Sequence, residues 1–258
     1  MDPKRFKIPF PYRAAIHGPT GSGKSYLISE FLANHQTVTT SDKPLMVLYC
    51  WRGKEPEPIR GVNIKTYQGI PDIEDILAIE RGGHCLTVVF DDLFENLSKL
   101  RQDTISEFIQ LVTEYSRKLE IGLIITIQQV FPDSYFLRTF SRNLTFLVLF
   151  PFPSDEDATL RLIHRICPSR KRTILEGLYH ANRFTKWSAY LFFSLHPHCN
   201  EPDIRIRTFL YPLENVTDNP VSPSRLFVLN SSSRWLKQAQ LQPPNRQAQG
   251  TMLQMEKM

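Results

Sequence analysis

Apolar residues follow two patterns that alternate along most of the chain. Short, nearly continuous apolar runs predict strands that are buried on both faces. These runs lie at 13–18, 44–51, 85–92, 122–129 and 144–152. Between them, apolar residues recur at helical spacing, as Leu27, Ile28 and Phe31 do. The helical segments lie at 24–35, 72–82, 103–119, 155–167 and 169–181. Strands that alternate with helices predict an α/β fold with a mainly parallel central sheet flanked by helices.

The carboxy-terminal part of the chain has a different texture. Segments 186–196 and 203–212 predict a late hairpin or edge strands, and from Leu213 onward Pro, Ser, Asn and Gln replace the apolar periodicity. We therefore expect one folded domain at 1–212 and a flexible, disordered tail at 213–258. An apolar island at 225–238 leaves open the alternative that part of this tail docks on a partner.

Composition narrows the class of protein only a little. The 258 residues carry a formal net charge of +5 and a pI near 9.0, a mild tilt toward polyanionic partners. The four cysteines are widely spaced and form no C-x-x-C pair, which predicts reduced thiols and an intracellular protein. No segment approaches the roughly 20 apolar residues of a membrane span, so no membrane partner is expected.

A glycine-rich loop follows the first predicted strand and fits the pattern G-x-x-x-x-G-K-[ST] at every required position. Its residues are Gly18, Pro19, Thr20, Gly21, Ser22, Gly23, Lys24 and Ser25. Glycines let successive backbone N–H groups turn inward around an anion, and the helix that follows adds its N-terminal dipole. Lys24 is predicted to reach the β- and γ-phosphates, and Ser25 to ligate Mg²⁺. The sequence thus predicts a P-loop that binds ATP and Mg²⁺.

Two aspartates end the predicted strand at 85–92. At the carboxyl edge of a parallel sheet, Asp91 is predicted to hold Mg²⁺ through water, and Asp92 to orient and deprotonate an attacking water. The alternatives are a solvated turn or a cap for the following helix. Water activation favours hydrolysis over transfer to a bound acceptor, which a P-loop kinase would perform.

Gln128 follows the next buried strand and is a second candidate at this edge. Its amide could hydrogen-bond the γ-phosphate or the lytic water and so report the loss of phosphate. The alternative is an ordinary polar residue that opens a loop.

Several blocks of the sequence together resemble one family. They are the segments "IPFPYRAAIHGPTGSGKS", "VLYCWRGKEPEPI", "VNIKTYQGIPD", "VVFDDL" and "ITIQQVFPDSYFLRTFSRNLTFLVLFPFPSDED". Over roughly Phe6 to Ala181 the chain resembles the FtsK/HerA-type genome-packaging ATPases of large DNA viruses and of the virus-like Polinton (Maverick) transposons. This resemblance implies a P-loop NTPase of the ASCE, FtsK/HerA-like class.

The resemblance also implies a function and its partners. It implies an ATP-hydrolysing motor that works as a homo-oligomeric ring, acts with capsid or portal proteins and moves double-stranded viral or transposon DNA into a capsid. The expected location is the host nucleus, the viral assembly site or the virion. Gln128 takes the place of the sensor glutamine. Arg138 falls where an arginine acting on a neighbour's nucleotide would lie, with Arg142 as second choice. The densest group of cations for DNA is Arg165, Arg170, Lys171 and Arg172, with a solvated helix end as the alternative.

A function of another class stays open on sequence grounds. The alternative is a nucleotide-binding switch or capsid-assembly protein that binds ATP and does not translocate DNA. Stimulation of hydrolysis by duplex DNA distinguishes the two.

Overall fold

The structure is a computed structural model. It describes residues 7–93, 102–128, 135–152, 154–166, 174–176, 178, 190–196 and 206–207. The predicted tail at 213–258 lies outside these residues, and the domain boundary at 212 stays a prediction.

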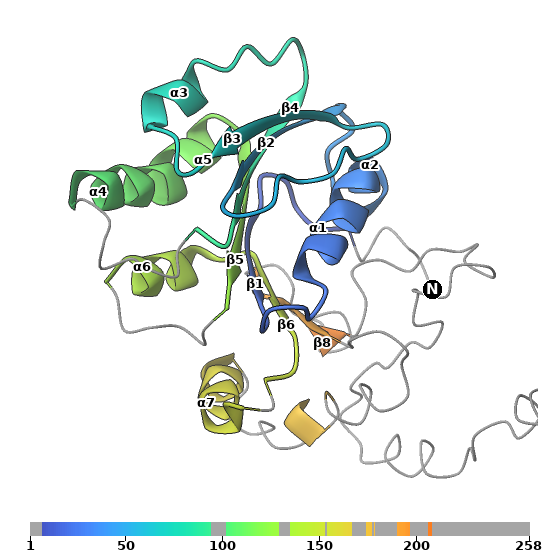
Figure 1. Ribbon diagram of the computed structural model, residues 1–258, viewed down its shortest axis with the longest axis vertical. Coiled ribbons are helices and arrows are strands. Elements are labelled where there is room, and N and C mark those ends of the chain that lie inside the picture. Colours follow the sequence, from blue (N-terminus) through green and yellow to red (C-terminus); the bar gives the residue numbers. More distant parts are fainter. Residues whose placement is uncertain are drawn as a thin grey trace, which may run out of the picture. The chain divides into compact units, whose positions relative to one another are not determined.

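An eight-stranded sheet organises the described residues, in the order β3-β2-β4-β5-β1-β6-β7-β8 (Figure 1). The strands are β1 (Arg13–His17), β2 (Leu45–Trp51), β3 (Asn63–Gln68), β4 (Cys85–Asp91), β5 (Ile121–Ile127), β6 (Phe146–Leu149), β7 (Leu191–Ser194) and β8 (Ile206–Arg207). All pairings from β3 to β6 are parallel, whereas β6–β7 and β7–β8 are antiparallel. The predicted α/β fold with a mainly parallel sheet is confirmed. The segments predicted as a late hairpin or edge strands contain β7 and β8, which pair antiparallel.

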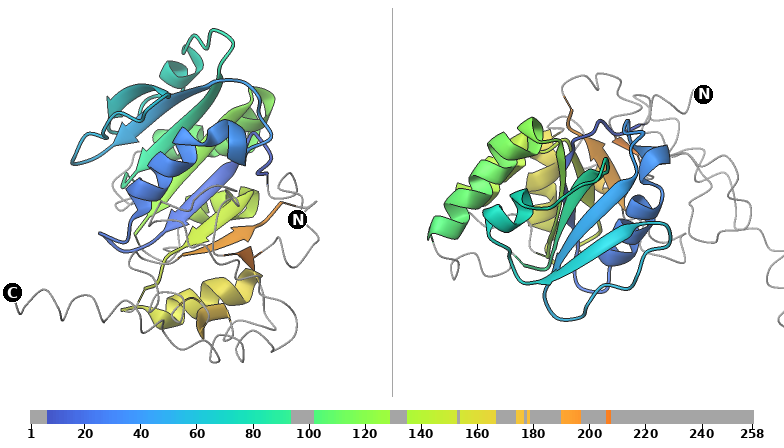
Figure 2. Two further views of the ribbon diagram at one scale, coloured as in Figure 1. Left: turned by 90° about the vertical axis from the view of Figure 1, so that its right-hand side faces the viewer. Right: turned by 90° about the horizontal axis from the view of Figure 1, so that it is seen from above.

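Helices cover both faces of this sheet. They are α1 (Lys24–Ala33), α2 (His35–Val38), α3 (Ile73–Leu77), α4 (Gln102–Gln110), α5 (Ser116–Lys118), α6 (Tyr135–Asn143) and α7 (Glu156–Ile166), with a π-helical segment (Leu111–Tyr115) between α4 and α5. Helix α1 lies on one face, and α4, α5 and α6 lie on the other (Figures 1 and 2). None of the helices in these described ranges has both the length and the apolar character needed to cross a bilayer.

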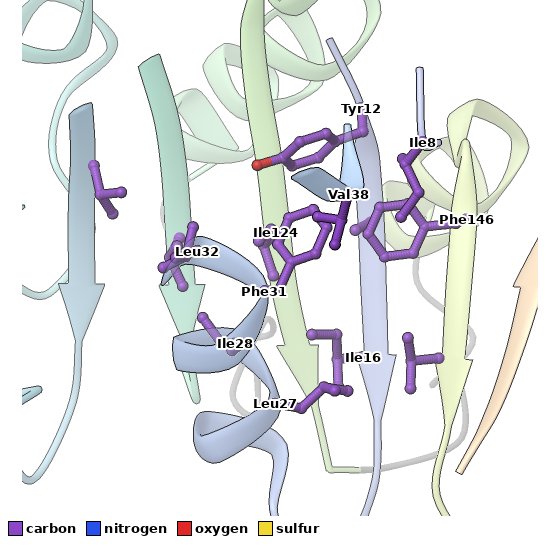
Figure 3. Packing of buried hydrophobic residues seen from close by; sticks show 14 of the residues in the cluster. Ile8, Tyr12, Ile16, Leu27, Ile28, Phe31, Leu32, Val38, Ile124 and Phe146 are labelled. Carbon is purple, nitrogen blue, oxygen red and sulfur yellow. The ribbon is translucent and has the colours of Figure 1, made fainter. Parts of the chain in front are cut away.

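The core on the α1 face is built by the apolar positions that predicted the helix. Leu27, Phe31 and Leu32 are buried in one cluster with Ile124 of β5 and Phe146 of β6 (Figure 3). Full burial of such a side chain stabilises the fold by about 1.5–3 kcal/mol. This packing holds α1 on the sheet. Because α1 begins directly after residues 18–23, it also holds one end of the glycine-rich loop.

The opposite face is closed by α4. Phe108 of α4 lies edge-on to Phe90 of β4, with ring centroids 4.5 Å apart. Strand β4 is buried from Cys85 to Phe90, and every residue of β5 is buried. Two-sided burial explains why both strands read as continuous apolar runs.

Several elements differ from the sequence-based expectation, among them the short helix α2, which was not predicted. Strand β3 was not predicted, because its six residues are mostly polar and exposed and it pairs on one side with β2. Helix α6 was also not predicted. Helix α3 ends at Leu77, earlier than the expected 82. The predicted helix at 103–119 contains the π-helical segment. Of the predicted helix at 169–181, residues 174–176 and 178 are described, and they are helical.

Candidate nucleotide-binding and hydrolysis site

The candidate site lies where four parallel strands end. The carboxyl ends of β1, β2, β4 and β5 meet at one edge of the sheet, because these strands are adjacent and run in the same direction. Ligands of open α/β sheets bind at this edge. The residues 18–23 connect β1 to α1 there.

The backbone of the loop requires glycine at two positions, 21 and 23. Gly21 has φ 76° and Gly23 has φ 98°, both in the left-handed region that a side chain disfavours. Gly23 is the N-cap of α1 and offers no side chain to the first helical N–H groups. Those N–H groups and the helix dipole suit an anion such as a phosphate. The predicted strand–P-loop–helix unit is therefore present.

Lys24 folds back into its own loop. Its side chain is 6% exposed, and its Nζ donates to the carbonyl oxygens of Gly18 at 2.9 Å and Pro19 at 3.1 Å. The backbone of the glycine-rich loop surrounds Lys24, and the lysine supplies a positive charge that can bind a phosphate. To play its predicted role, Lys24 must exchange these carbonyls for phosphate oxygens.

The loop and the acidic strand meet at Asp91. Ser25 Oγ donates to Asp91 Oδ2 at 3.2 Å, and Tyr49 OH donates to the same oxygen at 2.8 Å. The serine hydroxyl and the carboxylate are hard oxygen ligands, which Mg²⁺ prefers. The donor set therefore fits the predicted ion, with Ser25 and Asp91 as the residues that would hold it. Burial and the adjacent Asp91 charge raise the pKa of Tyr49, so this phenol stays a donor at all physiological pH values.

Asp92 lies beside Asp91 in an uncommon conformation. Its φ is 54°, and its backbone N–H donates to Thr126 Oγ1 at 2.8 Å. The same Thr126 hydroxyl lies 2.8 Å from Asp91 Oδ1 and 3.2 Å from Asp92 Oδ1. Tyr49 and Thr126 are site residues that the sequence analysis did not identify. The sequence feature that could have identified them is a hydroxyl side chain within a largely apolar predicted strand, Tyr49 in 44–51 and Thr126 in 122–129.

Gln128 lies beside the glycine-rich loop. Thr20 Oγ1 donates to Gln128 Oε1 at 3.0 Å, although the two residues are 108 positions apart in the sequence. The structure thus brings the predicted phosphate loop, the paired acids and the sensor glutamine to one edge of the sheet. Their roles remain predictions.

The predicted arginines are placed only in part. Arg138 lies in α6, with its side chain outside the described part of the chain, and Arg142 is exposed in the last turn of α6. Arg165 lies in α7, also without a described side chain, and residues 170–172 are outside the described ranges.

No protein-family model matches the chain, and no curated protein matches it. Solved structures do show similarity. One is the genome packaging NTPase B204 from Sulfolobus turreted icosahedral virus 2 in complex with ATP-gammaS, with 12% sequence identity, TM-score 0.46, and coverage of 72% of this chain and 93% of that chain. Another is B204, the DNA-packaging ATPase from Sulfolobus Turreted Icosahedral Virus, with 14% identity, TM-score 0.46, and coverage of 73% and 94%.

A third similar structure comes from a secretion system. The cytoplasmic domain of the Type VII Secretion ATPase EccC from Thermomonospora curvata has 18% identity and TM-score 0.45, and the match covers 75% of this chain and 25% of that chain. All three similarities concern the fold, at low sequence identity.

Proposed function

We propose that this protein hydrolyses ATP with Mg²⁺ and uses the energy to move double-stranded viral or transposon DNA into a capsid. One observation carries the hydrolysis part: Ser25 of the glycine-rich loop and Asp91 of the acidic strand are within hydrogen-bond distance, at 3.2 Å. Two elements 66 residues apart in the sequence can therefore share one metal ion. The packaging part is supported by the sequence resemblance.

The chain's own residues divide the work at this edge of the sheet. The loop amides and Lys24 bind the phosphates, Ser25 and Asp91 hold the ion, and Asp92 takes the proton of the attacking water. Mg²⁺ supplies charge that stabilises the phosphoryl group as it is transferred. Gln128, which already contacts the loop through Thr20, is close to the place where the γ-phosphate is expected.

The first experiment measures ATP hydrolysis by the full chain with and without duplex DNA. We expect many-fold stimulation by duplex DNA and loss of turnover in Asp92→Asn, with ATP binding retained. Asp42→Asn is the matched control, because Asp42 is exposed and precedes β2, whose other end, at Trp51, pairs with Asp91. Hydrolysis that is indifferent to DNA refutes the motor and favours a nucleotide-binding switch or capsid-assembly protein.

A ring makes a second test possible. If Arg138 completes the site of a neighbouring subunit, Arg138→Ala should bind ATP normally and still inhibit wild-type subunits in a mixed assembly. Arg142→Ala is the comparison variant on the same helix. Inhibition by Arg142→Ala alone would assign the role to Arg142 instead.

A further inference from the structure

Thr126 is a polar residue in β5, a strand whose residues are all buried. Its side chain is 1% exposed, and its chain neighbours Ile125 and Ile127 are buried apolar residues. Valine has the same shape and suits a buried strand at least as well. A buried hydroxyl is costly unless it is hydrogen-bonded, so the contacts of this hydroxyl explain its presence.

Those contacts are with both aspartates of the candidate site. Thr126 Oγ1 accepts the backbone N–H of Asp92 at 2.8 Å and lies 2.8 Å from Asp91 Oδ1 and 3.2 Å from Asp92 Oδ1. A threonine hydroxyl has one proton, so it donates to one carboxylate at a time. One proton is therefore shared between two acids that are predicted to have different tasks.

The backbone contact has a second effect. Asp92 has φ 54°, a left-handed conformation that strains a residue with a Cβ. The bond from the Asp92 N–H to Thr126 Oγ1 is made in this conformation and offsets part of its strain. The direction in which the Asp92 carboxylate leaves the strand thus depends on Thr126.

We propose that Thr126 is a positioning residue that sets the relative placement of Asp91, the metal-binding acid, and Asp92, the acid that activates water. This inference rests on the proposed hydrolysis. Thr126 acts through the two carboxylates and the backbone of Asp92. Its position in β5, between β1 and β4, gives it simultaneous access to both acids.

The test compares Thr126→Val, which removes only the hydroxyl, with Thr126→Ser, which keeps it. Partners of metal ligands typically change activity or metal affinity by about 10–100-fold when they are removed. We expect Thr126→Val to lower kcat by about that factor while KM for ATP stays within about threefold, because the contacts of the phosphate loop are intact. Thr126→Ser should recover most of the loss.

A second measurement does not depend on turnover. Mn²⁺ is titrated, by electron paramagnetic resonance, into the protein bound to a non-hydrolysable ATP analogue. Thr126→Val should weaken Mn²⁺ binding by about 10-fold, and Thr126→Ser should bind it nearly as wild type does. A residue with a merely structural role would lower the melting temperature and leave Mn²⁺ affinity unchanged.

Thr87→Val is the matched control. Thr87 is a buried threonine of β4 whose hydroxyl pairs with Tyr12 OH at 2.8 Å and makes no contact with the acids among the described hydrogen bonds. The Thr87→Val variant should be less stable than the wild type and keep the wild-type Mn²⁺ affinity. Equal Mn²⁺ losses in Thr87→Val and Thr126→Val overturn the inference. Wild-type kcat and Mn²⁺ affinity in Thr126→Val overturn it while the proposed function stands. A wild-type protein that binds no Mn²⁺ with the analogue refutes both.

Discussion

We expect the buried His35 to make the stability of the fold depend on pH. Its ring is 2% exposed and contacts Phe10, Tyr12 and Phe31, and neither ring nitrogen has a hydrogen-bond partner among the described residues. Burial lowers the pKa of His35 from 6.5 to about 4. The unfolded chain then binds a proton at a pH where the folded chain does not, so the free energy of unfolding falls as the pH drops from about 6.5 toward 4. The loss is about 2 kcal/mol at pH 5 and about 3 kcal/mol below pH 4.

The measurement is urea-induced unfolding from pH 7.5 to pH 4.5, on the wild type and on His35→Phe. The variant removes the titrating group and keeps an aromatic ring, so its unfolding free energy should fall by about 2 kcal/mol less between pH 7.5 and pH 5. His35→Leu serves if phenylalanine does not fit. His164→Asn removes an exposed histidine and should keep the wild-type pH dependence. If the curves of wild type and His35 variants stay parallel within about 0.5 kcal/mol, burial of a neutral imidazole does not govern acid stability.

Two further predictions concern the candidate site. Tyr49→Phe removes the 2.8 Å hydrogen bond to Asp91, and a hydrogen bond to a charged group is worth about 1.5–3 kcal/mol. The Mg²⁺ concentration that gives half-maximal ATP hydrolysis should therefore rise roughly 10-fold. An unchanged Mg²⁺ concentration contradicts this prediction. Gly18→Ala adds a Cβ that would lie 2.5 Å from Ser22 Oγ and 2.9 Å from Phe150 Cβ, so the loop must move. The affinity for a fluorescent ATP analogue should then drop by about 10-fold or more. Wild-type affinity in this variant contradicts the prediction.

The sequence predicts those parts of the fold whose residues carry a pattern of their own. The buried strands β4 and β5 are apolar at most positions, because helices cover both faces, and the sequence therefore predicts them. Strand β3 is an exposed edge strand with polar residues such as Lys65, and its pairing with β2 is set by tertiary structure. Helix α6 contains Thr139, Ser141 and Asn143, which are weak helix formers and lower the intrinsic helix propensity of this segment.

The same distinction applies to the candidate site. The glycine-rich loop could be predicted because its residues form one contiguous motif. Asp91 could be predicted because it ends an apolar strand. Tyr49 and Thr126 lie inside apolar runs, 77 residues apart, and only the strand order β2-β4-β5 brings both hydroxyls to Asp91. Sequence spacing contains no information about that order, so these two contacts required the structure.

The central position of β5 makes its alignment with its neighbours critical. Thr126 and Gln128 are two positions apart, about 6.6 Å along an extended chain, and they contact the paired acids and the glycine-rich loop respectively. Parallel pairing with β1 and β4 locks β5 from both sides. Inserting or deleting one residue before Thr126 would turn both side chains to the opposite face at once, so the two halves of the candidate site would be lost together.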